Sequence, residues 1–195
     1  MSAAVRLECS GPFSWLSSEP ATSVFEAATA RAAGIYLWTV DTRDGDLIYY
    51  VGETGVEFRQ RMHQHLSQQL AGMYHIYDPG LFAVGQKHAL WRGMYGNDRE
   101  AGLADFVERL PTFALALADF VRLMRFYLAP LTCDTRLRRR IDAALARHFY
   151  RQPGLVGSFQ DAGIRYVRRC AGDEPIDVRC QSSALLLGLP ACLEA

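Results

Sequence analysis

The sequence predicts an α/β protein of the α+β type: a small, mainly antiparallel sheet flanked by helices, with a helical insert and a C-terminal hairpin. Residues Ile35–Val40 and Leu47–Val51 are β-branched and aromatic runs, and the polar loop between them contains Asp44-Gly45, a strong hairpin signal. Farther along, Arg122–Leu131 has the composition of a strand and leads into a helical pattern over Thr135–Arg151.

The length of 195 residues predicts one domain with additions. A short strand at Val5–Cys9 and a helix at Ser23–Arg31, capped by Ser23, are expected before the hairpin. The insert is predicted as two helices that Pro111 separates. The expected units are an N-terminal extension (1–31), the main domain (32–160), its helical insert (about 96–120) and a C-terminal hairpin formed by Ile164–Cys170 and Ile176–Gln181 (161–195).

Composition indicates a cytoplasmic protein without membrane association. Half of the residues are hydrophobic, which suffices for a core, but no apolar run approaches the length of a membrane span. The first residues lack the basic region and apolar core of a secretion signal. The five cysteines are scattered, odd in number and without C-x-x-C spacing, which argues against a zinc site and a disulfide scaffold.

The charge is unevenly distributed along the chain. The formal net charge is zero, but the segment from Val121 to Arg151 carries eight arginines against two aspartates, a local net of +6 that leaves −6 for the rest. Arginine binds phosphate through its planar fork of donors. The segment is therefore either a phosphate-binding surface or an ordinary solvated helix face.

The hairpin and the helix after it bring four polar side chains toward one surface. The helix has apolar residues at four-residue spacing: Phe58, Met62, Leu66 and Leu70. Arg61 and His65 lie one turn apart and flank this stripe. Antiparallel pairing also brings the start of the first strand, with Tyr36, to the end of the second, with Tyr50.

This arrangement resembles the GIY-YIG nuclease family. The matching residues are Gly34-Ile35-Tyr36, then Tyr50-Val51-Gly52 in the YIG position, then Arg61 and His65 in an R-x-x-x-H helix. A weaker likeness resumes at Arg122–Phe149. The resemblance implies a metal-dependent endonuclease that hydrolyses phosphodiester bonds in DNA with one Mg²⁺ or Mn²⁺ ion.

The resemblance also implies a role for each catalytic residue. Tyr36 is expected to accept or relay the proton of the attacking water, with Tyr50 as the alternative. Arg61 is expected to bind the scissile phosphate and neutralise its charge. His65 is expected to relay the proton.

The metal ligand in this scheme is Asp142, where the family has a glutamate. Aspartate is a hard-oxygen ligand one methylene shorter, and the alternative is a helix ion pair with Arg138. Nucleic-acid contacts are expected from Arg59, Arg138 and Arg139, whereas Glu53 is expected to be a surface or groove charge.

Two further points stay open in the sequence. The family asparagine after the last helix is missing from Gln152–Gln160, where Ser158 or Gln160 are possible replacements, and the only asparagine is Asn97. The aromatic residues Tyr74, Tyr77 and Trp91 are either core residues or platforms for base stacking. The alternative function is a catalytically weakened nucleic-acid-binding or protein-interaction module on the same fold.

Overall fold

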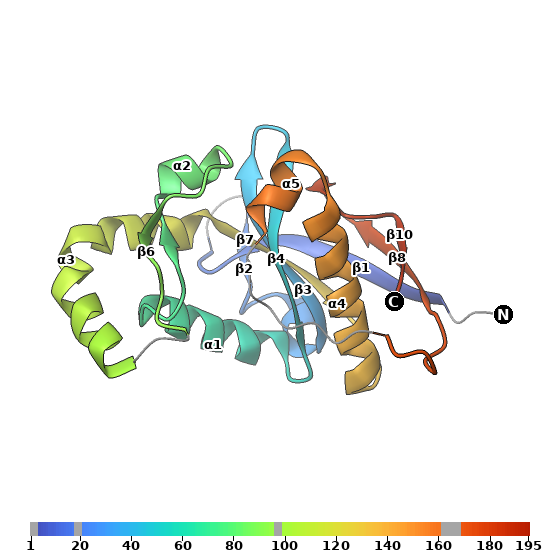
Figure 1. Ribbon diagram of the computed structural model, residues 1–195. Helices are drawn as coiled ribbons and strands as arrows, with labels where there is room; N and C mark the ends of the chain where they lie inside the picture. Colours follow the sequence, from blue (N-terminus) through green and yellow to red (C-terminus); the bar gives the residue numbers. More distant parts are fainter. Residues whose placement is uncertain (1–3, 18–20, 96–98, 161–168) are drawn as a thin grey trace.

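The sheet is built from strands that lie far apart in the chain. A computed structural model describes residues 4–17, 21–95, 99–160 and 169–195. The strands found there are β1 (Ala4–Ser14), β2 (Thr22–Ser23), β3 (Gly34–Thr42), β4 (Gly45–Thr54), β5 (Ile76–Tyr77), β6 (Ala89–Trp91), β7 (Met124–Pro130), β8 (Asp177–Ser182), β9 (Leu186–Leu187) and β10 (Cys192–Glu194). The main sheet has the order β10-β8-β1-β7-β3-β4-β9, with β2 paired to β1, while β5 and β6 form a separate pair. The sheet is curled and mostly antiparallel (Figure 1).

The helices cover both faces of this sheet. They are a 3-10 helix, η1 (Ala28–Arg31), and five α-helices in the described residues: α1 (Phe58–Leu70), α2 (Pro79–Ala83), α3 (Arg99–Leu123), α4 (Thr135–Arg151) and α5 (Gly154–Phe159). Helix α4 lies on one face, and α1, α2 and α3 lie on the other (Figure 1). Alternate residues of β3 enter two cores, because Ile35 and Leu37 pack on the α4 side and Tyr36 and Trp38 on the α1 side. The predicted mixed class, a mainly antiparallel sheet flanked by helices, is confirmed.

The β3–β4 hairpin forms as predicted. The two strands are joined at Thr42 and Gly45, and Tyr36 pairs with Gly52 across the ladder. The second strand is longer than the predicted Leu47–Val51, because β4 continues to Thr54. A register shift after Trp38 marks a bulge in the ladder, which changes the side-chain alternation along the hairpin.

The N-terminal residues are part of the sheet rather than an addition to it. The predicted strand at Val5–Cys9 is the longer β1, which lies between β8 and β7. The predicted helix at Ser23–Arg31 is wrong, since Ser23 belongs to β2 and only one 3-10 turn follows. The Ser23 hydroxyl donates to the Trp15 carbonyl at 3.1 Å, so a tertiary contact replaces the expected helix cap.

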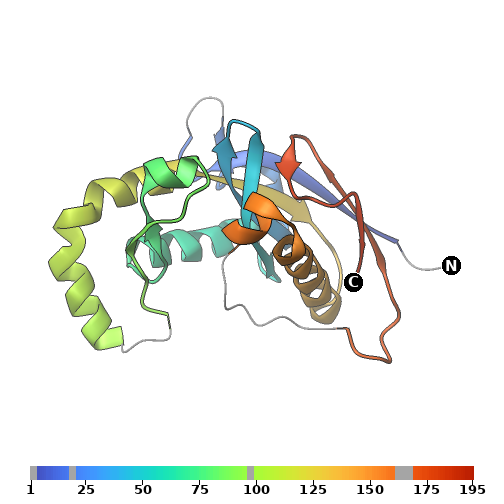
Figure 2. The ribbon, with the colours of Figure 1, turned by 45° about the horizontal axis from the view of Figure 1, so that its top comes forward.

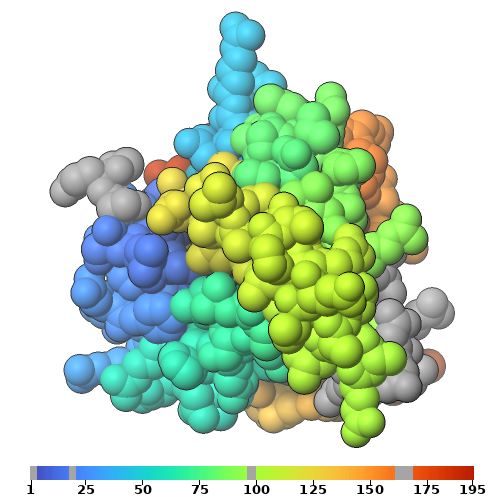
Figure 3. Space-filling view, turned by 90° about the vertical axis from the view of Figure 1, so that its left-hand side faces the viewer, coloured from blue at the N-terminus to red at the C-terminus, as the bar shows by residue number. Residues whose placement is uncertain are grey.

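The insert forms one helix instead of the predicted two. Pro111 lies inside α3, and Figure 2 shows the helix changing direction along its length. The rings of Phe106 and Phe113, on either side of the proline, lie 5.2 Å and 6.1 Å from Trp91 between centroids. Both halves of α3 therefore pack on Trp91. Helix α3 covers much of the face shown in Figure 3.

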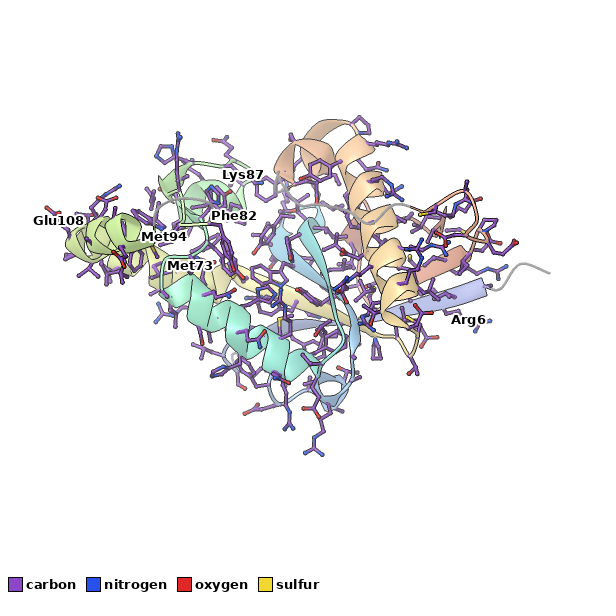
Figure 4. All side chains as sticks on the ribbon, turned by 60° about the horizontal axis from the view of Figure 1, so that its bottom comes forward. Arg6, Met73, Phe82, Lys87, Met94 and Glu108 are labelled. Atoms are coloured by element: carbon purple, nitrogen blue, oxygen red, sulfur yellow. The ribbon has the colours of Figure 1, made fainter. Side chains whose placement is uncertain are left out.

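The segment before the insert is also more helical than predicted. The sequence Phe82–Gly93 predicts a strand pair around Gly85-Gln86, but only β6 forms there, and it pairs with β5. Phe82 belongs to α2, whose N-cap Asp78 accepts a hydrogen bond from the Leu81 amide at 2.9 Å. Lys87 donates to the Gln160 carbonyl at 3.0 Å and joins this segment to α5 (Figure 4).

The last helix and the C-terminal strand agree with the sequence. Helix α4 begins after Asp134, which accepts from the Leu137 amide at 2.9 Å. Strand β8 matches the predicted second strand of the hairpin, but it pairs with β1 in parallel and with β10. The predicted first strand, Ile164–Cys170, lies mostly outside the described residues. No helix within the described ranges has both the length and the apolar character needed to cross a bilayer.

A candidate active site between the hairpin and helices α1 and α4

Tyr36 lies where β3 and β4 approach helix α1. Its side chain is 1% exposed, and its partner across the ladder is Gly52. A β-carbon at Gly52 would lie 2.4 Å from the Tyr36 hydroxyl oxygen. Glycine at this position therefore leaves the space that the phenol occupies. This explains why the tripeptide Tyr50-Val51-Gly52 ends in glycine.

The Tyr36 hydroxyl is the centre of a polar cluster. It lies 2.7 Å from Nε2 of His65, and Nε of Arg61 donates to it at 3.3 Å. The ring centroids of Tyr36 and Tyr50 are 6.2 Å apart, and burial raises the pKa of both phenols. The structure thus brings the four predicted catalytic residues together, while their roles stay predictions.

His65 belongs to the buried face of α1, contrary to the prediction that it flanks the apolar stripe. It is 2% exposed, and Gln69 in the next turn is 1% exposed, whereas Leu70 is 51% exposed. Phe58 and Met62 are buried as predicted. Gln69 Nε2 donates to the His75 carbonyl at 3.1 Å, so internal hydrogen bonds allow polar residues to occupy this face.

Tyr74 extends the cluster on the far side of His65. Its hydroxyl lies 2.8 Å from Nδ1 of His65 and donates to Oε1 of Gln68. Its ring stacks on Tyr95, with 5.5 Å between centroids. A cavity of about 70 Å³ adjoins these groups and is lined by Trp38, Tyr49, Tyr50, His65 and Tyr74.

Burial controls protonation in this cluster. It raises the pKa of Tyr36 to about 12, although the nearby Arg61 guanidinium acts in the opposite direction. Burial also lowers the pKa of His65 to about 3, and the charge of Arg61 adds to this effect. At neutral pH Tyr36 is therefore a neutral phenol and His65 a neutral imidazole.

Asp142, on helix α4, is linked to the same cluster by its charge. Its charge contributes to the raised pKa of both Tyr36 and Tyr50. Its Oδ1 atom is enclosed and makes no hydrogen bond within the described part of the chain. Burial, together with the charge of Glu53, raises the pKa of Asp142 to about 7. The alternative predicted for Asp142, an ion pair with Arg138, is not found among the described residues, because Arg138 binds Glu53.

Glu53, predicted as a surface or groove charge, is partly buried and links β4 to α4. Its carboxylate lies 2.6 Å from Nε of Arg138 and 3.5 Å from Nε of Arg139. Arg138 is 6% exposed, so this predicted nucleic-acid contact is enclosed and already neutralised, whereas Arg139 is exposed. Arg59 is exposed on α1 and pairs with Glu57 at 2.5 Å.

The carboxylate of Asp142 is the type of ligand that magnesium prefers. Among the described residues no group of three or more His, Cys, Asp or Glu side chains could form a closed metal cage. Mg²⁺, however, often binds one or two carboxylates and keeps waters and substrate phosphates as its other ligands. Oδ1 of Asp142, which makes no hydrogen bond within the described ranges, is available for that role, while both oxygens of Glu53 are held by arginines.

The residues considered as replacements for the family asparagine have other partners. Gln160 is 8% exposed, and its Nε2 donates to the Ile48 carbonyl at 2.7 Å, which ties the end of α5 to β4. Ser158 donates to a carbonyl of its own helix. Asn97 lies outside the described residues.

Sequence reasoning missed three residues of the site: Glu53, Gln68 and Tyr74. Strand alternation could have found Glu53, because it follows Gly52 and so faces the helix on the other side of the sheet. Gln68 lies one turn after His65 on α1. Tyr74 follows the chain reversal at Gly72, whose φ of 71° favours glycine, but nothing local predicts where that reversal directs its ring.

Comparison with known proteins gives no further identification. No protein-family model matches the chain, and neither curated proteins nor solved structures give a significant match. The GIY-YIG resemblance therefore rests on the residues quoted above, and it stays a prediction.

Proposed function

We propose that this protein is a metal-dependent endonuclease that hydrolyses phosphodiester bonds in DNA, in the manner of the GIY-YIG family. One observation carries the proposal: the Tyr36 hydroxyl is hydrogen-bonded to both Arg61 and His65, and its pKa responds to the charge of Asp142, whose Oδ1 makes no hydrogen bond among the described residues. Phosphodiester hydrolysis needs an activated water and stabilisation of charge on the phosphate and the leaving oxygen. These four side chains can supply those needs.

Arg61 is suited to bind the scissile phosphate. Its Nε donates to Tyr36 and its Nη1 to Gln64 at 3.3 Å, which leaves Nη2 for a phosphate oxygen. A bound phosphate also offsets the charge of Arg61, one of the two causes of the low pKa of His65. Substrate binding would therefore make His65 a better proton acceptor at the moment it is needed.

Tyr36 and His65 can together remove the proton of the attacking water. In this scheme Tyr36 takes the water proton as its own proton passes to Nε2 of His65, 2.7 Å away. The tyrosine stays neutral, so its high pKa is no obstacle, and the positive charge ends on His65. Asp142 would hold a Mg²⁺ ion, which supplies Lewis acidity toward the phosphate oxygens.

A nicking assay tests the proposal. Supercoiled plasmid and branched DNA are incubated with Mg²⁺ and either wild type, Arg61→Ala or the control Arg43→Ala, which changes an exposed arginine in the turn at the opposite end of the β3–β4 hairpin. We expect wild type and the control to nick the DNA, and Arg61→Ala to lose at least about 10²-fold in rate. Absence of Mg²⁺-dependent nicking by wild type on every DNA form would contradict the proposal.

Two substitutions of Asp142 test the metal ligand. Asp142→Asn removes the charge at nearly constant size and should abolish nicking. Asp142→Glu restores the family residue and its extra methylene. Nicking by Asp142→Glu but not by wild type would mean that the shorter ligand holds the protein in an inactive form.

The second candidate function is a binding module without catalysis. Helix α3 favours it, because Leu103, Val107 and Leu115 are 52%, 61% and 84% exposed, as expected for a surface that contacts another protein. DNA bound without nicking by wild type and by Asp142→Glu would support a nucleic-acid module. Neither binding nor nicking would favour a protein partner.

A further inference from the structure

The hydrogen bonds around the Tyr36 hydroxyl allow only one direction for its proton. Arg61 is a donor without acceptor capacity, and it donates to the Tyr36 oxygen. Among the hydrogen bonds of the described residues, the acceptor left for the proton of Tyr36 is its other neighbour, Nε2 of His65, 2.7 Å away.

The other end of the imidazole gives the same result independently. The Tyr74 hydroxyl, 2.8 Å from Nδ1 of His65, donates its single proton to Gln68. Toward His65, Tyr74 can then only accept. Nδ1 therefore carries the hydrogen of the neutral ring, and Nε2 carries the lone pair.

We infer that Tyr74 is a positioning residue, which accepts the hydrogen of Nδ1 and so keeps Nε2 of His65 free to take the proton of Tyr36. This inference rests on the proposed function, because the tautomer affects a rate only if a reaction takes place at Tyr36. Its logic is that of hydrolase sites in which a third group holds a catalytic histidine in one tautomer. Tyr74 touches neither water nor phosphate in this scheme and acts through His65.

The proton transfer balances when His65 has this tautomer. The O–H bond of water breaks and its proton joins the Tyr36 oxygen, while the O–H bond of Tyr36 breaks and an N–H bond forms at Nε2. The hydroxide attacks phosphorus, the bond to the leaving oxygen breaks, and that oxygen takes a proton from solvent. His65 ends as an imidazolium that Tyr74 stabilises by accepting from Nδ1–H, and its extra proton later returns to solvent.

The ring of Tyr74 is held by contacts that do not involve its hydroxyl. It stacks on Tyr95 and meets Trp38 edge-on, with 6.2 Å between centroids. Removal of the hydroxyl in Tyr74→Phe therefore leaves the ring supported. Tyr127→Phe is a suitable control, because it removes a buried tyrosine hydroxyl bonded to Asp46 in the core on the other face of the sheet.

Nitrogen-15 NMR of the histidine side chains tests the tautomer without any substrate. Signals of His65 are assigned by comparison with His65→Gln. We expect wild type and Tyr127→Phe to carry hydrogen on Nδ1, and Tyr74→Phe to move a measurable fraction to Nε2. A wild type protonated at Nε2, or a Tyr74→Phe protein with the wild-type tautomer, would overturn the inference.

The nicking rate tests whether the tautomer matters for the reaction. We expect Tyr74→Phe to lose about 10²-fold in single-turnover rate with little change in DNA affinity, and Tyr127→Phe to retain the wild-type rate. A Tyr74→Phe protein that shifts tautomer but nicks at the wild-type rate would contradict the positioning role. If wild type does not nick, the proposed function fails, and the NMR result alone decides the assignment of the tautomer.

Discussion

The Tyr36 ring lies directly on the backbone of Gly52, its partner across the β3–β4 ladder, with no room for a β-carbon between them. This contact orients the phenol toward Arg61 and His65. The glycine of the second tripeptide and the tyrosine of the first are thus one structural unit. A hairpin alone does not require that pairing.

Gly52→Ala should therefore displace Tyr36. Overpacking of this kind costs about 1 to 3 kcal/mol in the free energy of unfolding, and a shift of about 1 Å at a reacting group can reduce the rate about 10²-fold. Urea unfolding and single-turnover nicking measure the two effects. Gly172→Ala is the control, because a β-carbon there meets nothing within 4 Å; equal nicking by both variants would contradict this role of Gly52.

His65 should make the protein less stable in acid. Its pKa is about 3 in the folded state against 6.5 when unfolded, so between these values the unfolded state binds more protons and stability falls as the pH falls. The raised pKa of Asp142 acts in the opposite direction. A comparison with His65→Gln, which retains Asp142, removes that second effect.

Between pH 6.5 and pH 4, wild type should lose about 3 kcal/mol relative to His65→Gln in the free energy of unfolding. Urea unfolding at several pH values measures this difference. His63→Gln, an exposed position on the same helix, should follow wild type. Parallel pH profiles for wild type and His65→Gln would show that His65 is not buried in its neutral form.

Mg²⁺ should stabilise the protein through Asp142. A ligand present at ten times its dissociation constant adds about 1.4 kcal/mol to the stability of the folded state, equivalent to about 3 to 5 °C in the melting temperature of a chain this long. Asp142→Asn should lose this shift, whereas Asp177→Asn, an exposed aspartate on β8, should retain it. The same shift in all three proteins would place the ion elsewhere.

The Arg138–Glu53 pair should contribute far more to stability than the Arg59–Glu57 pair. Arg138→Met leaves Glu53 half-buried with only the longer contact to Arg139, and loss of one partner of an enclosed pair costs about 2 to 3 kcal/mol after allowance for that contact. Arg59→Met removes an exposed pair and should change stability by less than about 1 kcal/mol. Equal effects in urea unfolding would contradict the enclosed geometry.

The local parts of the fold could be predicted from the sequence because their signals are local. The Asp44-Gly45 turn, the strands beside it and the cap at Asp134 each depend on neighbouring residues. The place of β1 could not be predicted, because it pairs with β7 and β8, more than a hundred residues away. Pro111 indicated a break, but packing on Trp91 kept α3 continuous.

The site was predictable to the extent that its residues lie in the hairpin and α1. Tyr36, Arg61 and His65 follow from spacing, and the structure brings them together. The burial of His65 could not be predicted from the spacing, because it depends on contact with Tyr74, which lies in the loop after α1. The ion pair between Arg138 and Glu53 could not be predicted either, since it depends on how α4 crosses β4.

The most direct test of the central claim is single-turnover nicking of supercoiled DNA with Mg²⁺ by wild type and Tyr36→Phe. The substitution keeps the ring on Gly52 and removes only the oxygen that contacts Arg61 and His65. We predict Mg²⁺-dependent nicking by wild type and a loss of about 10²- to 10⁴-fold in Tyr36→Phe. Equal rates in the two proteins, or no nicking by wild type, would contradict the assignment of Tyr36 as the residue that accepts the water proton.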